Sequence, residues 1–125
     1  MADRIFKIFL KDKTTDVIGD WLAGLPAKDR AKIRSRISYL KTTAIWPQNW
    51  CKKYEPYDDI YELRIQLGNN LYRPLGFFGP GQNEFTLLIG AKEQGDQIFP
   101  RAAPEVADAR RKLILREKGY TDDFI

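Results

Sequence analysis

From Ile60 onward the hydrophobic pattern adopts a strict period of two, and this feature constrains the fold more than any other. Apolar Tyr61, Leu63, Ile65 and Leu67 alternate with polar Glu62, Arg64 and Gln66, as in a half-buried β-strand. Turn residues at Gly68-Asn69-Asn70 and Gly79-Pro80-Gly81 then separate two further predicted strands, Leu71 to Phe78 and Glu84 to Lys92. Three strands joined this closely predict an antiparallel meander.

Helical patterns precede and follow the meander. Thr14-Thr15-Asp16 are N-cap residues for a helix from Val17 that ends before Pro26, and a second helix is predicted from Ala27 to about Leu40. A strand from Arg4 to Leu10, a loop from Thr42 to Asp59 and a basic helix from Ala103 to Lys118 complete the chain. We therefore predict an α+β fold, a single domain of residues 1–125. In it an N-terminal αα-hairpin and the C-terminal helix pack on one face of a small antiparallel sheet.

Composition excludes several kinds of chemistry. The chain has no histidine, so no imidazole acid or base and no histidine-ligated metal are possible. A single cysteine, Cys51, excludes an internal disulfide, and we expect an idle thiol because nothing nearby can act as its base. No apolar run approaches the roughly 20 residues of a membrane span, and no Gly-rich phosphate loop is present. We expect a cytoplasmic protein with no metal and no cofactor.

Charge points to a polyanionic partner. The formal net charge is only +4, but Lys28 to Lys41 contains six cations against one anion, and Arg101 to Lys118 six against three. Clustered cations attract nucleic acids, although they also keep helices soluble. The candidate RNA-binding residues are Arg101, Lys52, Lys53, Arg110 and Arg111. Trp46, Trp50, Tyr54 and Tyr57 in the long loop can stack on bases or pin the loop onto the core.

Strand register predicts which polar groups share a face. With the turn centred on Asn69-Asn70, Gln66 pairs with Arg73 and Arg64 pairs with Leu75. Glu62, Arg64 and Arg73 then project to one side, and alternation along the third strand adds Lys92. Three cations on a strand surface make a phosphate site, with scattered solvent-facing charges as the alternative. Glu62 is either a general base or the salt-bridge partner of Arg64, and Lys92 with a lowered pKa is the other candidate base.

Several short motifs carry a resemblance to a known family. The run Ile60-Tyr61-Glu62-Leu63-Arg64-Ile65 followed by Leu71-Tyr72-Arg73 resembles the "LYELR … YR" signature of RelE/ParE-superfamily toxins, in particular the phage-related HigB-like branch. Trp21-Leu22, the strand Leu87 to Lys92 and the helix from Pro104 to Arg110 resemble further elements of that family in the same order. The chain departs from it at Glu93, where the family has a second lysine, at Ile89, where many members have histidine, and at Phe99, where some have a catalytic tyrosine.

The resemblance implies a RelE-like fold and a toxin of a type II toxin–antitoxin pair. It implies an endoribonuclease that cuts messenger RNA on the ribosome by attack of the ribose 2′-hydroxyl on the adjacent phosphate. Arg73 matches the arginine that stabilises the phosphorane, while Arg64, Glu62 and Lys92 match positions of other catalytic groups, and Arg101 takes over part of the missing tyrosine's role. The implied partner is an antitoxin, commonly a helix-turn-helix protein, so that DNA is bound only through the partner. The alternatives are a ParE-like toxin that acts on DNA gyrase and an inactive phage-derived binding protein.

Overall fold

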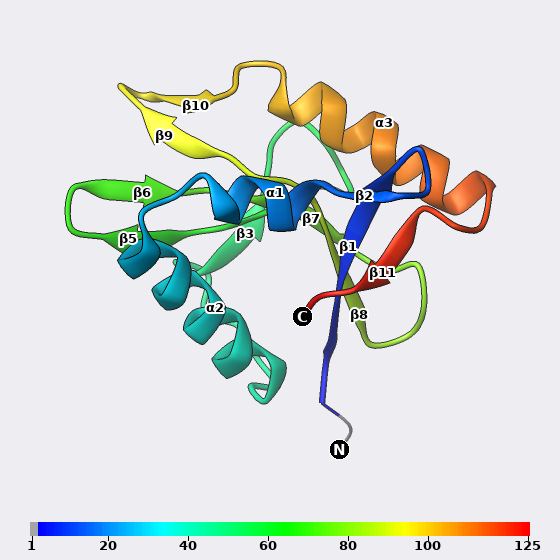
Figure 1. The fold of residues 1–125 in the computed structure, drawn as a ribbon, viewed down its shortest axis with the longest axis horizontal. Coiled ribbons are helices and arrows are strands. Elements are labelled where there is room, and N and C mark those ends of the chain that lie inside the picture. Colours follow the sequence, from blue (N-terminus) through cyan, green and yellow to red (C-terminus); the bar gives the residue numbers. More distant parts are fainter. Residues whose placement is uncertain (1–2) are drawn as a thin grey trace.

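The computed structural model describes residues 3–125, which form three helices and eleven strands in two sheets (Figure 1). The helices are α1 (Val17–Ala23), α2 (Ala27–Lys41) and α3 (Ala103–Arg116). The strands are β1 (Ile5–Lys11), β2 (Thr15–Asp16), β3 (Cys51–Lys53), β4 (Tyr61–Leu63), β5 (Ile65–Leu67), β6 (Asn70–Tyr72), β7 (Leu75–Phe78), β8 (Glu84–Ile89), β9 (Lys92–Gln94), β10 (Gln97–Phe99) and β11 (Thr121–Asp123). The predicted α+β class is confirmed.

The larger sheet is mixed and not purely antiparallel as predicted. Its order is β11-β1-β8-β7-β4-β3, and β1 pairs with β8 in parallel while the other neighbours are antiparallel. The burial of Phe6, Ile8 and Phe9 explains the inner position of β1, because a strand with apolar side chains on both faces needs cover on both. The edge strands β3 and β11 were not predicted, since each is only three residues long and mostly exposed.

The helices cover both faces of the sheet, so the prediction of one covered face is wrong. Ile18 and Leu22 of α1 and the buried side of α2 pack with Phe85 and Leu87 in one core. Ala103, Ala107 and Ile114 of α3 pack with Leu75, Phe77 and Leu88 in a second core on the opposite face. We call these the hairpin face and the α3 face. In Figure 1, α1 crosses in front of the sheet and α3 lies well apart from α2.

Each of the three predicted meander strands is broken, and their outer parts, in β5, β6 and β9, form a separate sheet with β10 in the order β10-β9-β6-β5. The breaks fall at Arg64, at Arg73-Pro74 and at Gly90-Ala91. Pro74 explains one of them, because proline has no N–H to donate to a strand ladder. The backbone still bridges the junction, since the Arg73 N–H donates to the Ala91 carbonyl at 2.8 Å. The junction between the sheets therefore places Arg64 and Arg73 side by side in space.

The predicted register is wrong by two residues. Ile65 pairs with Tyr72 and Gln66 with Leu71, so the turn is centred on Gly68-Asn69, and Gly68 has the positive φ of 60° that suits glycine. A shift of two residues keeps every side chain on its expected face, because side chains alternate with a period of two. Arg73 therefore still shares the face of Glu62 and Arg64.

The helix predictions are confirmed in their main bounds. Asp16 caps α1, since its carboxylate accepts hydrogen bonds from the N–H groups of Ile18 and Gly19 at 2.9 and 2.7 Å. Helix α2 begins at Ala27 as predicted, and α3 begins at Ala103 with Pro104 in its first turn. It ends at Arg116, two residues before the expected end at Lys118.

Candidate functional site

A cluster of four charged side chains lies on the α3 face at the junction of the two sheets. We call it the Arg73 cluster, and it consists of Glu62, Arg64, Arg73 and Glu93. Arg73 Nε donates to Glu62 Oε2 at 2.5 Å, and Arg64 approaches the same carboxylate at 3.4 Å. On its other side Arg73 donates to Glu93 Oε1 at 3.4 Å. The chain breaks at Arg64 and Arg73 thus bring together two guanidinium groups around one carboxylate.

Exposure differs sharply within the Arg73 cluster. The side chain of Glu62 is 2% exposed and that of Arg73 is 12% exposed, whereas Arg64 reaches 27% and Glu93 35%. Burial lowers the pKa of Arg73, but the hydrogen bond with Glu62 and the charges of Glu62 and Glu93 outweigh it, so the pKa lies above its usual value. Arg73 is therefore a permanent cation, and Glu62 acts as its buried counter-ion. The predicted ion pair between Glu62 and Arg64 is present at 3.4 Å, and the role of Glu62 as a general base stays a prediction.

Two more side chains adjoin the Arg73 cluster. The guanidinium carbon of Arg73 lies 5.8 Å from the centre of the Tyr54 ring, within the range of a cation–π contact. Lys52 is the direct partner of Glu62 in the β3–β4 pair, which puts both on the same face of the sheet. Lys52, which the sequence predicted as an RNA-binding residue, thus lies near the cluster.

Lys92 does not join the Arg73 cluster, so its predicted placement is wrong. The pairing of β7 with β8 shifts between Leu75 and Gly76, which leaves one extra residue in β8. An extra residue reverses the alternation of faces beyond it. Lys92 consequently pairs with Tyr72, whose side chain belongs to the hairpin-face core, and Glu93 takes the position beside Arg73. The sequence signal for Glu93 was its replacement of a lysine found in the resembling family.

The other predicted RNA-binding cations lie in different settings. Arg101 is exposed just before α3, and Lys53 forms an ion pair with Asp58 at 3.5 Å. Arg110 donates to the Leu88 carbonyl at 2.7 Å, and burial lowers its pKa. Arg111 forms ion pairs with Asp59 and Asp108 at 3.6 and 3.3 Å. Arg110 and Arg111 therefore secure α3 to the rest of the fold.

The arginines of α2 are likewise used within the protein. Arg30 donates to the Leu25 carbonyl at 3.2 Å, and the guanidinium of Arg36 lies 4.2 Å from the centre of the Trp50 ring. Arg34 donates to the backbone carbonyl of Ile125 and lies over the ring of Phe124. Lys28 and Lys32 remain exposed on the helix surface. The basic segment of α2 thus connects α2 to its neighbours with arginine and leaves lysine at the surface.

The aromatic loop is held on the protein, which is the second of its two predicted uses. Trp46 and Trp50 pack against the hairpin-face core, and Tyr54 and Tyr57 pack against the α3-face core. Cys51 lies between them, and burial raises the pKa of its thiol to about 12 against a smaller lowering by Arg4. The thiol therefore stays protonated at neutral pH, consistent with an idle cysteine.

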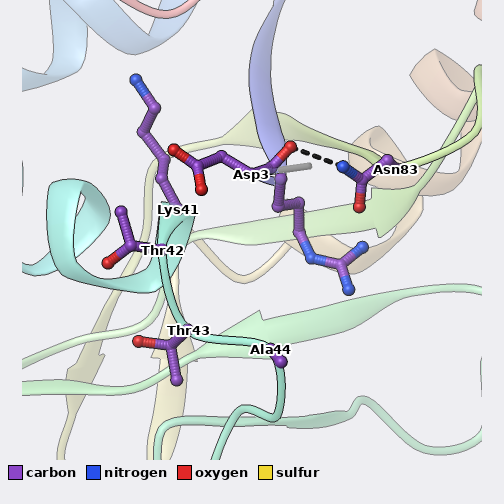
Figure 2. A pocket seen from close by; sticks show the side chains of 7 residues that line it. Asp3, Lys41, Thr42, Thr43, Ala44 and Asn83 are labelled. Atoms are coloured by element: carbon purple, nitrogen blue, oxygen red, sulfur yellow. Dashed lines mark hydrogen bonds between the residues drawn. The ribbon is translucent and has the colours of Figure 1, made fainter. Parts of the chain in front are cut away.

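A small cavity lies away from the Arg73 cluster, between the start of β1 and the C-terminal end of α2. Its volume is about 120 Å³, and Lys41, Thr42 and Thr43 line one side of it. Figure 2 shows Asp3 and Asn83 on the other side, joined by a hydrogen bond from the Asn83 amide to the Asp3 carbonyl. The cavity holds a carboxylate and a lysine but none of the candidate catalytic residues, so it offers no alternative site for the predicted chemistry.

Residues 3–125 contain no group of three or more His, Cys, Asp or Glu side chains arranged to hold a metal ion. None of the helices described here combines the length and the apolar character needed to cross a membrane.

Comparison with known proteins places the chain in a family. Residues 20–112 match the family model of the phage-derived protein Gp49-like group (DUF891), which spans most of the 125 residues and includes the whole Arg73 cluster. The chain belongs to this Gp49-like family. The family is associated with toxin–antitoxin proteins of the RelE/HigB-like kind. No curated protein and no solved structure matched the chain.

Proposed function

We propose that this protein is the toxin of a type II toxin–antitoxin pair and cleaves messenger RNA on the ribosome. The observation that carries the proposal is the pairing of Arg64 and Arg73 around the buried Glu62 at the sheet junction. Membership of the Gp49-like family supports the toxin class. The RelE-like and HigB-like assignments rest on the sequence motifs around these same residues.

The proposed reaction needs charge stabilisation more than any other contribution. The ribose 2′-oxygen attacks phosphorus and the bond to the 5′-oxygen breaks, which leaves a cyclic phosphate and a 5′-hydroxyl. Water takes up the proton that the 2′-hydroxyl loses during the attack, and water returns a proton to the departing 5′-oxygen. The pentacoordinate phosphorane carries extra negative charge, and cations fixed in advance around it lower the barrier. Arg73 supplies a rigid guanidinium for this charge, and Arg64 supplies a second one that is more exposed.

Glu62 is assigned a positioning role in this scheme. Its carboxylate is almost fully buried and bound to both arginines, so accepting the 2′-hydroxyl proton would require it to leave Arg73. Glu62 holds Arg73 through Nε, so it does not occupy the terminal nitrogens, one of which contacts Glu93 at 3.4 Å. Lys92 lies on the hairpin face and is left out of the proposed catalytic set.

The proposed partners follow from the toxin class. An antitoxin, of the helix-turn-helix kind in the resembling family, neutralises the toxin and connects the complex to DNA. Lys52, which adjoins the Arg73 cluster, and the exposed Arg101 are the residues best placed to extend contact along an RNA strand.

The test is induction of the chain alone in a bacterial host, followed by mapping of 5′-hydroxyl ends in cellular RNA. We expect growth arrest and in-frame cleavage of translated messages. Arg73→Ala and Arg73→Gln are each expected to lower cleavage by about 10²- to 10³-fold. The glutamine variant retains a donor for Glu62 and so guards against a folding defect. Arg116→Ala, which removes the same charge from an exposed position on α3, is the matched control and should cleave normally.

Other results would favour the other functions. Arrest with intact messages and DNA damage would replace the nuclease with a gyrase-directed toxin. No arrest and no cleavage would leave a phage-derived binding protein.

A further inference from the structure

Glu93 occupies the outer side of the guanidinium that the proposed function requires. Its carboxylate lies 3.4 Å from the terminal nitrogen Nη1 of Arg73, whereas Glu62 is bound through Nε. The glutamate is carried by the β9–β10 hairpin, where it pairs with Ile98, and the Arg73 backbone is bound to the neighbouring Ala91. Strand pairing therefore holds this carboxylate beside Arg73.

The charges of the Arg73 cluster cancel in the present arrangement. Two guanidinium groups face two carboxylates, so an approaching phosphodiester meets a neutral cluster in place of a cationic one. A carboxylate and a phosphate are alternative partners for the same guanidinium nitrogens, since both are anionic oxygen acceptors. A phosphate can reach Arg73 on this side only after Glu93 leaves.

The two carboxylates differ in how readily they leave. Glu62 is bound at 2.5 Å with 2% of its side chain exposed, so its departure would strand a buried charge. Glu93 is bound at the longer distance of 3.4 Å with 35% exposed, and ion pairs of that kind contribute little because water solvates the separated charges. Glu93 is thus the exchangeable ligand of Arg73, and Glu62 is the permanent one.

We propose that Glu93 is an internal competitor for the RNA phosphate at Arg73, and that RNA binds by displacing it. The proposal rests on the proposed function, because it takes Arg73 to be the phosphate-binding residue. It makes Glu93 a determinant of affinity: a backbone with many phosphates compensates for the displaced carboxylate through its other contacts, whereas a single phosphate does not.

The experiment measures binding of a fluorescent single-stranded RNA whose 2′-hydroxyls are methylated, so that it cannot be cleaved. Wild type, Glu93→Gln, Asp96→Asn and Arg73→Gln are compared over a series of salt concentrations. Asp96 is the matched control, because it is an exposed carboxylate in the turn of the same hairpin. We expect Glu93→Gln to bind about fivefold more tightly at low salt. Its log–log salt dependence should steepen by up to about 0.7, because no displaced carboxylate then takes up a cation in exchange for the one that the phosphate releases. Asp96→Asn should change both quantities much less.

The outcomes separate this proposal from the function beneath it. Equal effects of Glu93→Gln and Asp96→Asn would overturn the competitor role and reduce it to general electrostatics, provided that Arg73→Gln still weakens binding. Unchanged binding by Arg73→Gln, or no binding by any variant, would overturn the phosphate site and the competitor together. Binding that appears only in Glu93→Gln would support the proposal in its strongest form.

Discussion

Tyr72 is the last residue of β6 and Arg73 follows it directly, yet their side chains lie on opposite faces and in opposite kinds of environment. On the hairpin face the Tyr72 hydroxyl donates to Asp29 of α2 at 2.5 Å, and the tyrosine is 3% exposed. On the α3 face Arg73 lies between a buried carboxylate and a half-exposed one. The end of β6 therefore carries the buried hydrogen bond of Tyr72 with Asp29 on one face. On the other face lies the more exposed ion pair of Arg73 with Glu93.

The difference comes from what covers each face. Helix α2 lies over Tyr72, and burial raises the pKa of its phenol to about 12, with Asp29 adding to the shift. Arg73 is flanked by Glu93 of β9, the strand that pairs with β6 in the same sheet, and Glu93 and Arg64 both stay partly in water. A polar contact under a packed helix stabilises the fold, whereas one at a sheet junction stays accessible to a ligand.

The largest expected effect is the protection of the Cys51 thiol, which tests how well the hairpin-face core excludes solvent. The thiol packs against that core, and its pKa of about 12 lies far above that of a free cysteine. We expect alkylation by iodoacetamide at neutral pH to be about a thousandfold slower in the native protein than in the urea-unfolded chain. Mass spectrometry of the labelled protein over time measures both rates. Equal rates would mean that the hairpin-face core opens freely at β3.

Removal of Arg73 tests how much its ion pair with the buried Glu62 contributes to stability. We expect Arg73→Met to lower the free energy of unfolding by about 3 kcal/mol, because Glu62 then keeps only the longer contact with Arg64. A double variant, Glu62→Leu with Arg73→Met, should recover most of the loss, since it removes the stranded charge. Urea unfolding followed by tryptophan fluorescence measures both. A double variant no more stable than the single one would show that the cost comes from packing.

Tyr72→Phe removes a polar contact on the hairpin face and should lower the free energy of unfolding by less than Arg73→Met does. We expect a loss of about 1 kcal/mol, because one hydrogen bond is removed and the partly exposed Asp29 is solvated by water. Tyr39→Phe, at an exposed tyrosine of the same helix that holds Asp29, is the matched control and should be neutral. A loss as large as that of Arg73→Met would erase the contrast between the two faces.

The pH dependence of the free energy of unfolding also tests the hydrogen bond between Tyr72 and Asp29. The folded-state pKa of Tyr72 is raised from 10.0 to about 12, so its protonated form stabilises the fold fully below pH 10, and this stabilisation is lost as the pH rises towards 12. The stability difference between wild type and Tyr72→Phe should therefore shrink between about pH 10 and pH 12. Urea unfolding at several pH values measures it, and a constant difference would mean that Tyr72 ionises as easily folded as unfolded.

Local patterns in the sequence predicted the helices and the faces of the strands. Asp16 before an apolar stripe marked the start of α1, and the alternation from Tyr61 to Leu67 put Glu62 and Arg64 on one side and Leu63 and Ile65 on the other. These features depend on neighbours within a few residues, so sequence spacing alone determines them. The two-residue error in register left each side chain on its predicted face, because side chains alternate with a period of two.

Predictions that depended on distant parts of the chain were wrong or incomplete. The extra residue in β8 moved Lys92 to the hairpin face and brought Glu93 to Arg73. The parallel pairing of β1 with β8 and the placement of α3 opposite the αα-hairpin both join segments far apart in the sequence. The local sequence pattern of a strand or helix does not indicate which distant segment it packs against.

The sequence by itself determined the helices, the absence of imidazole chemistry and the arginines that share a face, because residue type and spacing settle these locally. Only the tertiary structure decided that Glu62 is a buried counter-ion, that Glu93 stands where a lysine was expected, and that most arginines of α2 and α3 are used within the fold. The physical reason is that a charge takes its role from its burial and its partners, and both arise only when distant segments pack together.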